Sequence, residues 1–399
     1  MKLLSALRSP LVFILALSAY LLVARDLVYR PSIAPYFINL AEAFVDGKVE
    51  INIDGTSTYD LIYREQKWFV AQPPLPSMML VPFMLVYDRP SDVMLGVLLG
   101  ATSVMLCERV LQTSMPQLSW WRRALLVAFF AFGTAHLYLA TMGTVWFLGQ
   151  TSAVLALWLF IQLVLARRPV VAGLALALVL LARPSIGPGA LIFALLYWWE
   201  DGQKLIARLV ALLLPVVLSI TFLGAYNALR FGDPLEFGYG FINDSSAIKE
   251  RRETFGSFSL AFLPDNLYTA TLKPPREFNL GCLTNPDCGV ITPDLWGMGL
   301  LWTSPLLLAG LLSPRDRLFW AVALGSALIM LPSLLYHNSG SAQFGYRFSL
   351  DALPLWLLAV ARVVQAWPVP LLVPTVTYSL ILNVIGTLWL MGQIIPPLK

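Results

Sequence analysis

Apolar runs recur along this chain from its N-terminus to its C-terminus, separated mostly by short polar segments. A helix that crosses a bilayer needs about 20 apolar residues, and several of the runs reach or approach that length. The composition agrees, since 58% of the 399 residues are hydrophobic and 13% are charged. Soluble domains have about 45–50% apolar and about 25% charged residues. The sequence therefore predicts an all-α membrane protein with several spans.

The Lys and Arg residues between the runs orient the predicted helices, because short cytoplasmic loops collect positive charge. With Lys2 and Arg8 in the cytoplasm, about eleven spans place the later basic clusters inside and the C-terminus outside. The first run could also be a cleaved secretory signal, but more apolar runs follow, so we expect an uncleaved span within a single membrane domain, 1–399. The expected spans are 10–25, 91–108, 124–143, 150–166, 169–182, 187–199, 205–226, 295–312, 318–335, 351–365 and 368–390.

The stretch "YREQKWFVAQPPLPSMMLVPF" (63–83) changes from polar to apolar at two adjacent prolines. The apolar part, 76–87, has only about twelve residues, too few to cross a membrane. Prolines favour the first turn of a helix, so an abrupt helix start is expected here. We expect a re-entrant or interfacial helix in the first outer loop. The alternative, a short tilted span, would invert the orientation of everything downstream.

Three polar segments then lie on the outer face: the first loop (26–90), the second loop (227–294) and the third loop (336–351). The predicted cytoplasmic segments are short and basic. A membrane protein with its polar mass on one face is expected to work on that face.

Within the first loop, "PYFINLAEAFVDGKVEI" is typical of an amphipathic helix that ends at Gly47. The residues at helical spacing on its apolar face are Tyr36, Phe37, Leu40, Ala41 and Phe44, and the polar ones are Asn39, Glu42 and Asp46. Such a helix is suited to the headgroup plane.

This helix, with its aromatic-x-x-x-Ala-x-x-Phe-x-x-Gly pattern followed by an aromatic pair and Pro-Pro, resembles the first outer loop of the GT-C membrane glycosyltransferases. It is most similar to bacterial relatives of the protein O-mannosyltransferases and of the lipid A aminoarabinose transferase. Further matching stretches are "GTAHLYLATMGTVWFLGQ" (133–150), "LLARPS" (180–185), "YNALRFGDPLEFGYG" (226–240), "WGMGLLWTSPLLL" (296–308) and "QFGYRFSLDALP" (343–354).

The resemblance implies a GT-C-like helical bundle in the inner (plasma) membrane of a bacterium. It implies inverting transfer of a hexose or pentose from a polyprenyl-phosphate donor to a glycan, lipid or protein acceptor at the outer face, without nucleic acid. The family usually has an acidic residue just ahead of the interfacial helix, whereas "YRPSIAPYF" contains none. The base must therefore come from elsewhere in the loop.

Displacing a lipid phosphate from an anomeric carbon needs a carboxylate that accepts the proton of the acceptor hydroxyl. Asp60 is the first candidate, because it lies close in sequence to Arg64 and Lys67 and shortly before the prolines. It could equally be a turn or cap residue. Asp26 is the second candidate, unless it only pairs with Arg25 or Arg30.

The leaving phosphate needs cations or hydrogen-bond donors. Arg347, in "GYRFSLD", and Arg183, in "LARPS", are the leading candidates, since the planar guanidinium matches phosphate oxygens. Arginines near helix ends also snorkel to the interface without binding a ligand. Lys67 and His337 are secondary candidates, and His136, in an apolar run, is expected to be a core residue.

The chain contains no Asp-x-Asp motif for a metal-bound nucleotide sugar and no GxxxxGK[ST] motif for ATP. Arginines can neutralise one phosphate, so we expect chemistry without a metal or other cofactor. A lipid or sugar transporter (a flippase) is the alternative function, but it should show internal repeats and matching interrupted helices. A single outward cavity that joins the first loop, Arg183 and Arg347 would favour the transferase.

Cys282 and Cys288, in "CLTNPDC", lie in the second outer loop, where paired cysteines usually form disulfides. The Asn-Pro-Asp sequence between them is a strong turn signal. We expect a disulfide here and a reduced Cys107 in its apolar span, with two free thiols in an inside-facing loop as the alternative.

Overall fold

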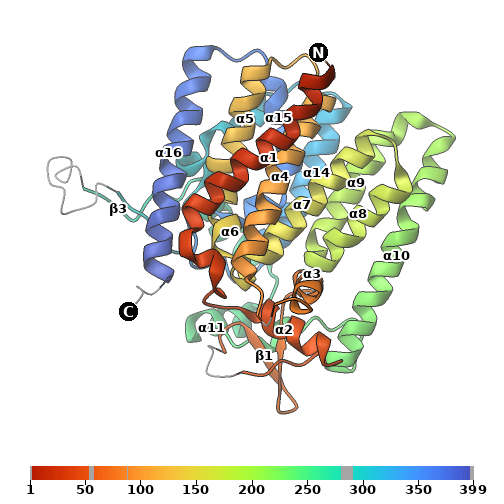
Figure 1. Ribbon diagram of the computed structural model, residues 1–399, viewed down its shortest axis with the longest axis vertical. Helices are drawn as coiled ribbons and strands as arrows, with labels where there is room; N and C mark the ends of the chain where they lie inside the picture. Colours follow the sequence, from red (N-terminus) through yellow and green to blue (C-terminus); the bar gives the residue numbers. More distant parts are fainter. Residues whose placement is uncertain (1, 54–57, 88, 280–290, 396–399) are drawn as a thin grey trace.

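The computed structural model describes residues 2–53, 58–87, 89–279 and 291–395. It is an upright bundle of helices with short helices and a hairpin gathered at one end (Figure 1). The helices of the bundle are α1 (Lys2–Ala24), α4 (Asp92–Ser114), α5 (Trp120–Phe132), α6 (His136–Met142), α7 (Val145–Leu165), α8 (Pro169–Ala182), α9 (Gly187–Trp198), α10 (Lys204–Phe231), α14 (Arg317–Leu335), α15 (Leu353–Val364) and α16 (Val369–Ile394).

Shorter elements lie between these helices. They are α2 (Tyr36–Val45), β1 (Leu61–Arg64), β2 (Lys67–Val70), α3 (Leu75–Met84), α11 (Ser246–Phe255), α12 (Leu263–Thr271), β3 (Glu277–Phe278), β4 (Ile291–Thr292) and α13 (Leu300–Thr303). Strands β1 and β2 form an antiparallel hairpin, as do β3 and β4. We call α2, α3, the β1–β2 hairpin and α11 the outer-loop layer, after the predicted outer loops from which they come; they lie together at the lower end in Figure 1.

Six helices of the described chain are long and apolar enough to cross a membrane, and α5 with α6 makes a seventh, bent one. They are α1, α4, α7, α10, α14 and α16. Helices α8 and α15 are apolar but shorter. The structure therefore confirms a multi-span helical protein, but not the predicted count of about eleven full-length spans. The start of α1 and the end of α16 lie at opposite ends of the bundle, as an odd number of crossings requires (Figure 1).

Two predicted spans are interrupted. The expected helix 124–143 is bent by 51° between α5 and α6, where Gly133 ends α5. The expected helix 295–312 consists of the four-residue α13 and the 3-10 helix η7 (Pro305–Leu312). Its break falls at Ser304, whose φ of −148° is not helical, because the ring of a following proline disfavours the helical conformation. The prediction of one continuous helix in each segment was therefore wrong.

Helix α2 begins and ends near its predicted limits, and Gly47 just beyond it has a φ of +70°. However, its predicted polar face is only partly in water, since Glu42 and Asp46 are exposed in part but Asn39 is not. Asn39 is 6% exposed, and Arg89 donates hydrogen bonds to Asn39 Oδ1 (3.1 Å) and Glu42 Oε1 (3.0 Å). Helix α2 is thus packed inside the protein on most sides, against α3 among others. Its apolar residues Tyr36, Phe37 and Leu40 face the protein interior, and the placement of the helix at the headgroups stays a prediction.

Helix α3 begins directly after Pro73 and Pro74, as the sequence predicts, and it has ten residues. Pro74 occupies its N-cap, where a missing N–H has no cost. The helix packs against α2, α7 and α8. It therefore ties the first loop to the bundle close to the ends of two spans.

Small residues allow the closest helix pairs of the bundle. A side chain added at Gly173 of α8 would lie 2.2 Å from the Leu212 carbonyl of α10, and one added at Gly189 of α9 would lie 2.2 Å from the Gly325 carbonyl of α14. Membrane helices associate largely through such close packing. These contacts hold α8 against α10 and α9 against α14.

Candidate active site

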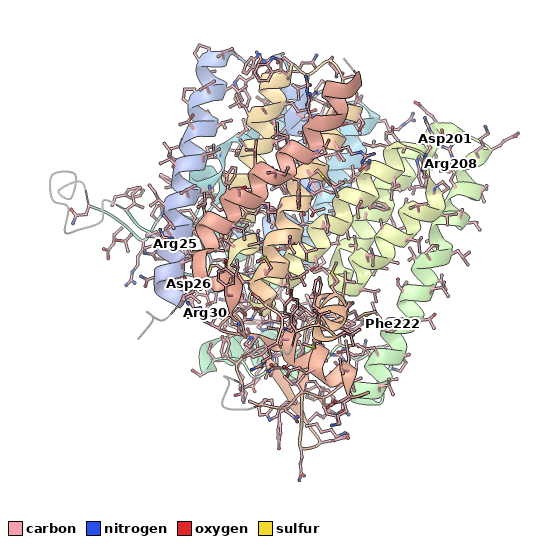
Figure 2. All side chains as sticks on the ribbon, in the orientation of Figure 1. Arg25, Asp26, Arg30, Asp201, Arg208 and Phe222 are labelled. Atoms are coloured by element: carbon pink, nitrogen blue, oxygen red, sulfur yellow. The ribbon has the colours of Figure 1, made fainter. Side chains whose placement is uncertain are left out.

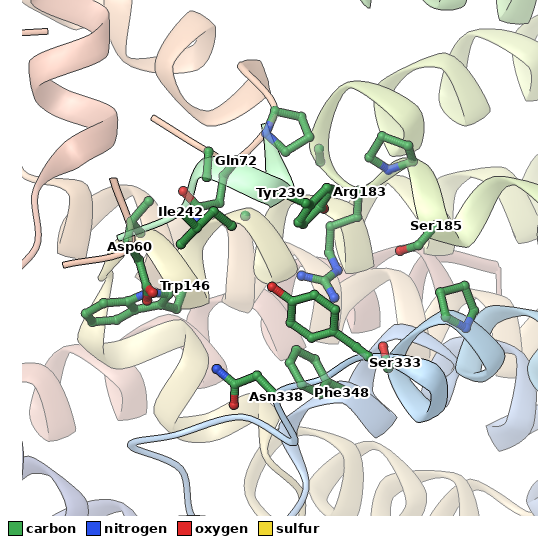
Figure 3. A pocket seen from close by; sticks show the side chains of 18 of the residues that line it. Asp60, Gln72, Trp146, Arg183, Ser185, Tyr239, Ile242, Ser333, Asn338 and Phe348 are labelled. Atoms are coloured by element: carbon green, nitrogen blue, oxygen red, sulfur yellow. The ribbon is translucent and has the colours of Figure 1, made fainter. Parts of the chain in front are cut away.

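A cavity of about 170 Å³ lies between the outer-loop layer and the ends of the bundle helices (Figure 3). Its walls come from the first loop, the start of α7, the end of α8, and the second and third outer loops. The polar and aromatic residues that line it include Asp60, Gln72, Trp146, Arg183, Tyr239, Asp244, Tyr336, Asn338 and Arg347. The structure thus brings Asp60, Arg183 and Arg347 to one cavity.

Asp60 stands immediately before β1 in a left-handed conformation, with a φ of +63°. Asp tolerates this conformation better than most residues. Its backbone N–H donates to Asn243 O (3.1 Å) in the second outer loop. Its side-chain Oδ2 accepts a hydrogen bond of 2.5 Å from Trp146 Nε1 at the start of α7. The carboxylate is therefore held at the cavity by two other segments of the chain (Figure 3).

Burial raises the pKa of Asp60 from 3.8 to about 6. The hydrogen bond from Trp146 opposes this rise, the nearby Asp244 carboxylate adds to it, and the Arg347 guanidinium opposes it. A carboxylate with a pKa of about 6 accepts a proton more readily than an ordinary aspartate and is still ionised at neutral pH. Asp60 thus has the protonation behaviour of a general base.

Arg183 caps the C-terminal end of α8, and Arg347 begins the 3-10 helix η8 (Arg347–Asp351). Arg347 is 8% exposed, and its guanidinium lies 5.0 Å from the centre of the Phe348 ring. The Nε atoms of both arginines are buried and have no hydrogen-bond partner in the part of the chain that the structure describes. Unpaired buried donors are costly, so this wall of the cavity is suited to an anion.

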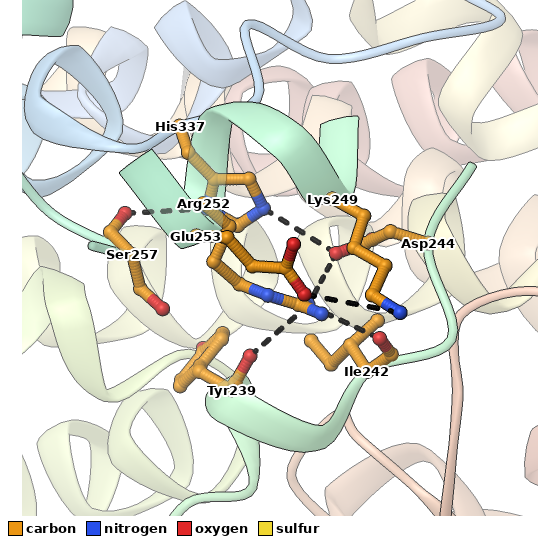
Figure 4. A network of polar contacts seen from close by, with 8 residues as sticks. All are labelled: Tyr239, Ile242, Asp244, Lys249, Arg252, Glu253, Ser257 and His337. Atoms are coloured by element: carbon orange, nitrogen blue, oxygen red, sulfur yellow. Dashed lines mark hydrogen bonds and ion pairs between the residues drawn. The ribbon is translucent and has the colours of Figure 1, made fainter. Parts of the chain in front are cut away.

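Asp244 of the second outer loop also lines the cavity, and it is held from behind by two cationic or potentially cationic side chains (Figure 4). Arg252 of α11 forms an ion pair with it, and His337 Nε2 lies 3.5 Å from Asp244 Oδ2. His337 Nδ1 is 3.3 Å from the carbonyl oxygen of Ser257. His337 is therefore behind the cavity wall, where it joins the third outer loop to the second.

Two other candidates do not reach the cavity. Lys67 lies on β2, half exposed, and pairs with Glu50 at 3.0 Å. Asp26 is half exposed and pairs with Arg30 at 3.2 Å, close to Arg25 (Figure 2). The positions of both side chains fit local ion pairs rather than ligand binding.

The remaining predictions from the sequence concern the three cysteines and His136. Cys282 and Cys288 lie outside the described residues, so their disulfide stays a prediction. Cys107 is a free, buried thiol in α4. His136 is buried and its Nδ1 lies 2.9 Å from the Tyr20 hydroxyl, as expected of a core histidine.

Sequence reasoning missed Trp146, Asp244 and Asp351 as site residues. Trp146 and Asp351 both lie in stretches that carry the family resemblance, but neither the indole nor this aspartate stood out by charge pattern. Asp244 lies in "FINDSS", a polar loop with no distinguishing motif. Only the fold brings these three residues beside the arginines and Asp60.

No family model matches the chain, and no curated protein matches it. Among solved structures, the chain is similar to ArnT from Cupriavidus metallidurans bound to undecaprenyl phosphate. The sequences are 14% identical and the TM-score is 0.49, over 88% of this chain and 59% of that one. The chain thus spans less than two thirds of the length of that protein. At this distance the likeness assigns neither a family nor an activity.

Proposed function

We propose that this protein is a membrane glycosyltransferase that moves a sugar from a polyprenyl-phosphate donor to an acceptor hydroxyl. One observation carries the proposal: Asp60, Arg183 and Arg347 line the same cavity, beside the ends of apolar helices. A carboxylate base opposite two cations is what displacement of a phosphate from an anomeric carbon requires.

In the proposed reaction, the acceptor oxygen attacks the anomeric carbon from the side opposite the phosphate. The bond from that carbon to the phosphate oxygen breaks, and its electron pair leaves with the polyprenyl phosphate. Asp60 takes the proton of the acceptor hydroxyl as the new glycosidic bond forms. A single displacement of this kind inverts the anomeric centre. The hydrogen bond from Trp146 to Asp60 Oδ2 (2.5 Å) leaves Oδ1 to receive the proton.

Arg183 and Arg347 would bind the donor phosphate and stabilise the charge that grows on it. Their unpaired Nε–H groups need acceptors, and phosphate oxygens supply them. We propose that these two arginines, without a metal ion or another cofactor, neutralise the leaving group. The donor's lipid chain would lie among the apolar helices while its headgroup reaches the cavity.

The position of the cavity favours a transferase over a lipid or sugar transporter. Transporters of the inverted-repeat type bind their substrate near the middle of the membrane, between broken helices. Here Trp146, Arg183 and Pro332 reach the cavity from the ends of α7, α8 and α14. We propose that this end faces the outside, in the inner membrane of a bacterium, and that the acceptor is a glycan, lipid or protein.

The test uses the purified full-length protein with a panel of polyprenyl-phosphate hexoses and pentoses and, in parallel, nucleotide sugars. We expect one of the lipid-linked donors to be consumed with release of polyprenyl phosphate, and Asp60→Asn to remain inactive. Consumption of a nucleotide sugar alone would reject the donor class. Movement of an intact lipid-linked sugar across vesicles without cleavage would indicate the transporter.

A further inference from the structure

Behind the cavity wall lie two buried polar side chains, Gln150 and Asp351. They connect Arg183 and Arg347, the two arginines that line the cavity. Gln150 lies on α7 and is fully buried, and Asp351 ends η8 and is 1% exposed. Neither residue lines the cavity. They would therefore influence a ligand only through the residues they hold.

Asp351 contacts both a cavity arginine and the glutamine. Its Oδ2 lies 2.7 Å from Arg183 Nη2, and its Oδ1 accepts a hydrogen bond of 2.9 Å from Gln150 Nε2. The same Gln150 nitrogen donates to the backbone oxygen of Arg347 at 3.1 Å. The backbone N–H of Arg347 in turn donates to Gln343 Oε1 at 3.0 Å. One connected set of contacts thus links α8, α7 and η8 at the site.

We infer that Asp351 is a positioning residue that aims the Arg183 guanidinium at the donor phosphate, with Gln150 holding Asp351 in place. Asp351 lies against Nη2, which leaves Nε–H of Arg183 unpaired for a ligand. A free arginine side chain loses rotamer entropy when it binds an anion, and a guanidinium already held in place avoids part of that loss. This inference rests on the proposed function, since the anion is taken to be the phosphate of a lipid-linked donor.

The competing explanation is that Asp351 only neutralises a buried cation. The two explanations predict opposite changes in the affinity of Asp351→Asn for an anion. If Asp351 only neutralised Arg183, its replacement by asparagine would leave more positive charge at the cavity and strengthen anion binding. If Asp351 positions Arg183, the same substitution weakens binding, because the guanidinium is no longer held in one orientation.

The experiment measures the Kd of farnesyl phosphate, a short prenyl phosphate, for the purified full-length protein in detergent, with farnesol as the ligand that lacks the phosphate. Asp351→Asn and Arg183→Gln are each expected to weaken farnesyl phosphate binding about tenfold. The double variant is expected to bind no more weakly than Arg183→Gln alone, because Asp351 acts through that arginine. Farnesol binding is expected to stay unchanged in all three.

Glu108→Gln is the matched control. Glu108 is also a buried carboxylate paired with an arginine, Arg123, at 3.5 Å, but the pair is remote from the cavity. Its substitution is expected to leave Kd unchanged. Thermal unfolding of each variant shows whether the protein is folded. If Asp351→Asn does not fold, Gln150→Met gives the same test, with an expected loss of about threefold in affinity from the weakened anchoring.

Tighter binding by Asp351→Asn, or losses that add up in the double variant, would overturn the positioning role and leave the proposed function standing. Unchanged binding by a folded Gln150→Met, where that variant is needed, would do the same. If the wild-type protein binds farnesyl phosphate no better than farnesol, the donor-phosphate site itself fails, and the positioning role with it.

Discussion

Arginines pair differently at the two ends of the helical bundle. At the end away from the outer-loop layer, Arg362 binds both carboxylate oxygens of Asp316, at 2.7 and 2.6 Å, and Arg123 pairs with Glu108. The hydrogen bonds from Arg362 lower the pKa of Asp316. These arginines each have an acidic partner, as residues that stabilise the structure do.

At the cavity end, Arg183 has an acidic partner as well, Asp351, but the two arginines that line the cavity also keep donors that have no partner in the described part of the chain. Arg183 and Arg347 have unpaired Nε atoms among the described residues, and Asp60 accepts its side-chain hydrogen bond from an indole instead of a guanidinium. Burial raises the pKa of Asp60, and the hydrogen bond from the indole offsets only part of that rise. Arginines at one end are thus held in ion pairs, whereas those at the cavity keep donors that the proposed donor phosphate would use.

The largest effect that would test this contrast is the loss of the base. Asp60→Asn should lower turnover about 10²- to 10⁴-fold, because it removes only the group that accepts the proton. Turnover is measured as release of polyprenyl phosphate, with donor binding measured in parallel and expected to persist. Asp26→Asn, in the exposed pair with Arg30, is the control and should keep its activity. If only Asp26→Asn were inactive, the roles of the two aspartates would be exchanged.

The next largest effect is expected when an arginine at the cavity is replaced, compared with replacement of an arginine at the other end. Arg347→Ala should lower kcat/KM for the donor about tenfold to a hundredfold, the cost of losing a hydrogen bond to a charged group. Arg315, which contacts the backbone oxygens of Leu311 and Ser313 away from the cavity, is the matched site for Arg315→Ala. Steady-state kinetics give kcat/KM for the donor in both variants. Equal losses would mean that Arg347 only anchors the protein.

A smaller effect concerns pH. Asp60 must be ionised to accept a proton, so kcat/KM should fall as the pH drops through about 6, to about a tenth of its plateau one pH unit lower. Trp146→Phe removes the hydrogen bond that lowers the pKa of Asp60, so the acid limb should move to higher pH. The pH profiles of the two proteins test this. If the acid limb lay at the same pH in the wild-type protein and in Trp146→Phe, it would not report the ionisation of Asp60.

The smallest expected effect is that of metal removal. If Arg183 and Arg347 neutralise the phosphate, incubation with a strong chelator should leave turnover within about twofold of the untreated protein, since arginine alone can bind a phosphate. The assay is repeated with added Mg²⁺ and Mn²⁺ after chelation. If chelation lowered turnover and one of these ions restored it, a metal ion would be needed at the cavity in addition to the two arginines.

The sequence alone predicted most helix positions well. Helix α8 lies at the predicted residues 169–182, and α14 and α16 lie within a few residues of theirs. The prolines before α3 also marked its start. The bend between α5 and α6 and the break before Pro305 were missed, since an apolar run does not show whether its helix is continuous.

The class of the protein and most helix positions follow from the sequence alone, because the length and polarity of a run decide locally whether a helix is stable in lipid. The sequence also supplied Asp60, Arg183 and Arg347 as candidates. The packing of the folded chain is what brings these three to one cavity, keeps Lys67 and Asp26 away from it, and buries most of α2. Asp60 contacts a residue 86 positions away, and Gln150 one 201 positions away. Such contacts arise from the packing of distant segments, and no local pattern of residues specifies them.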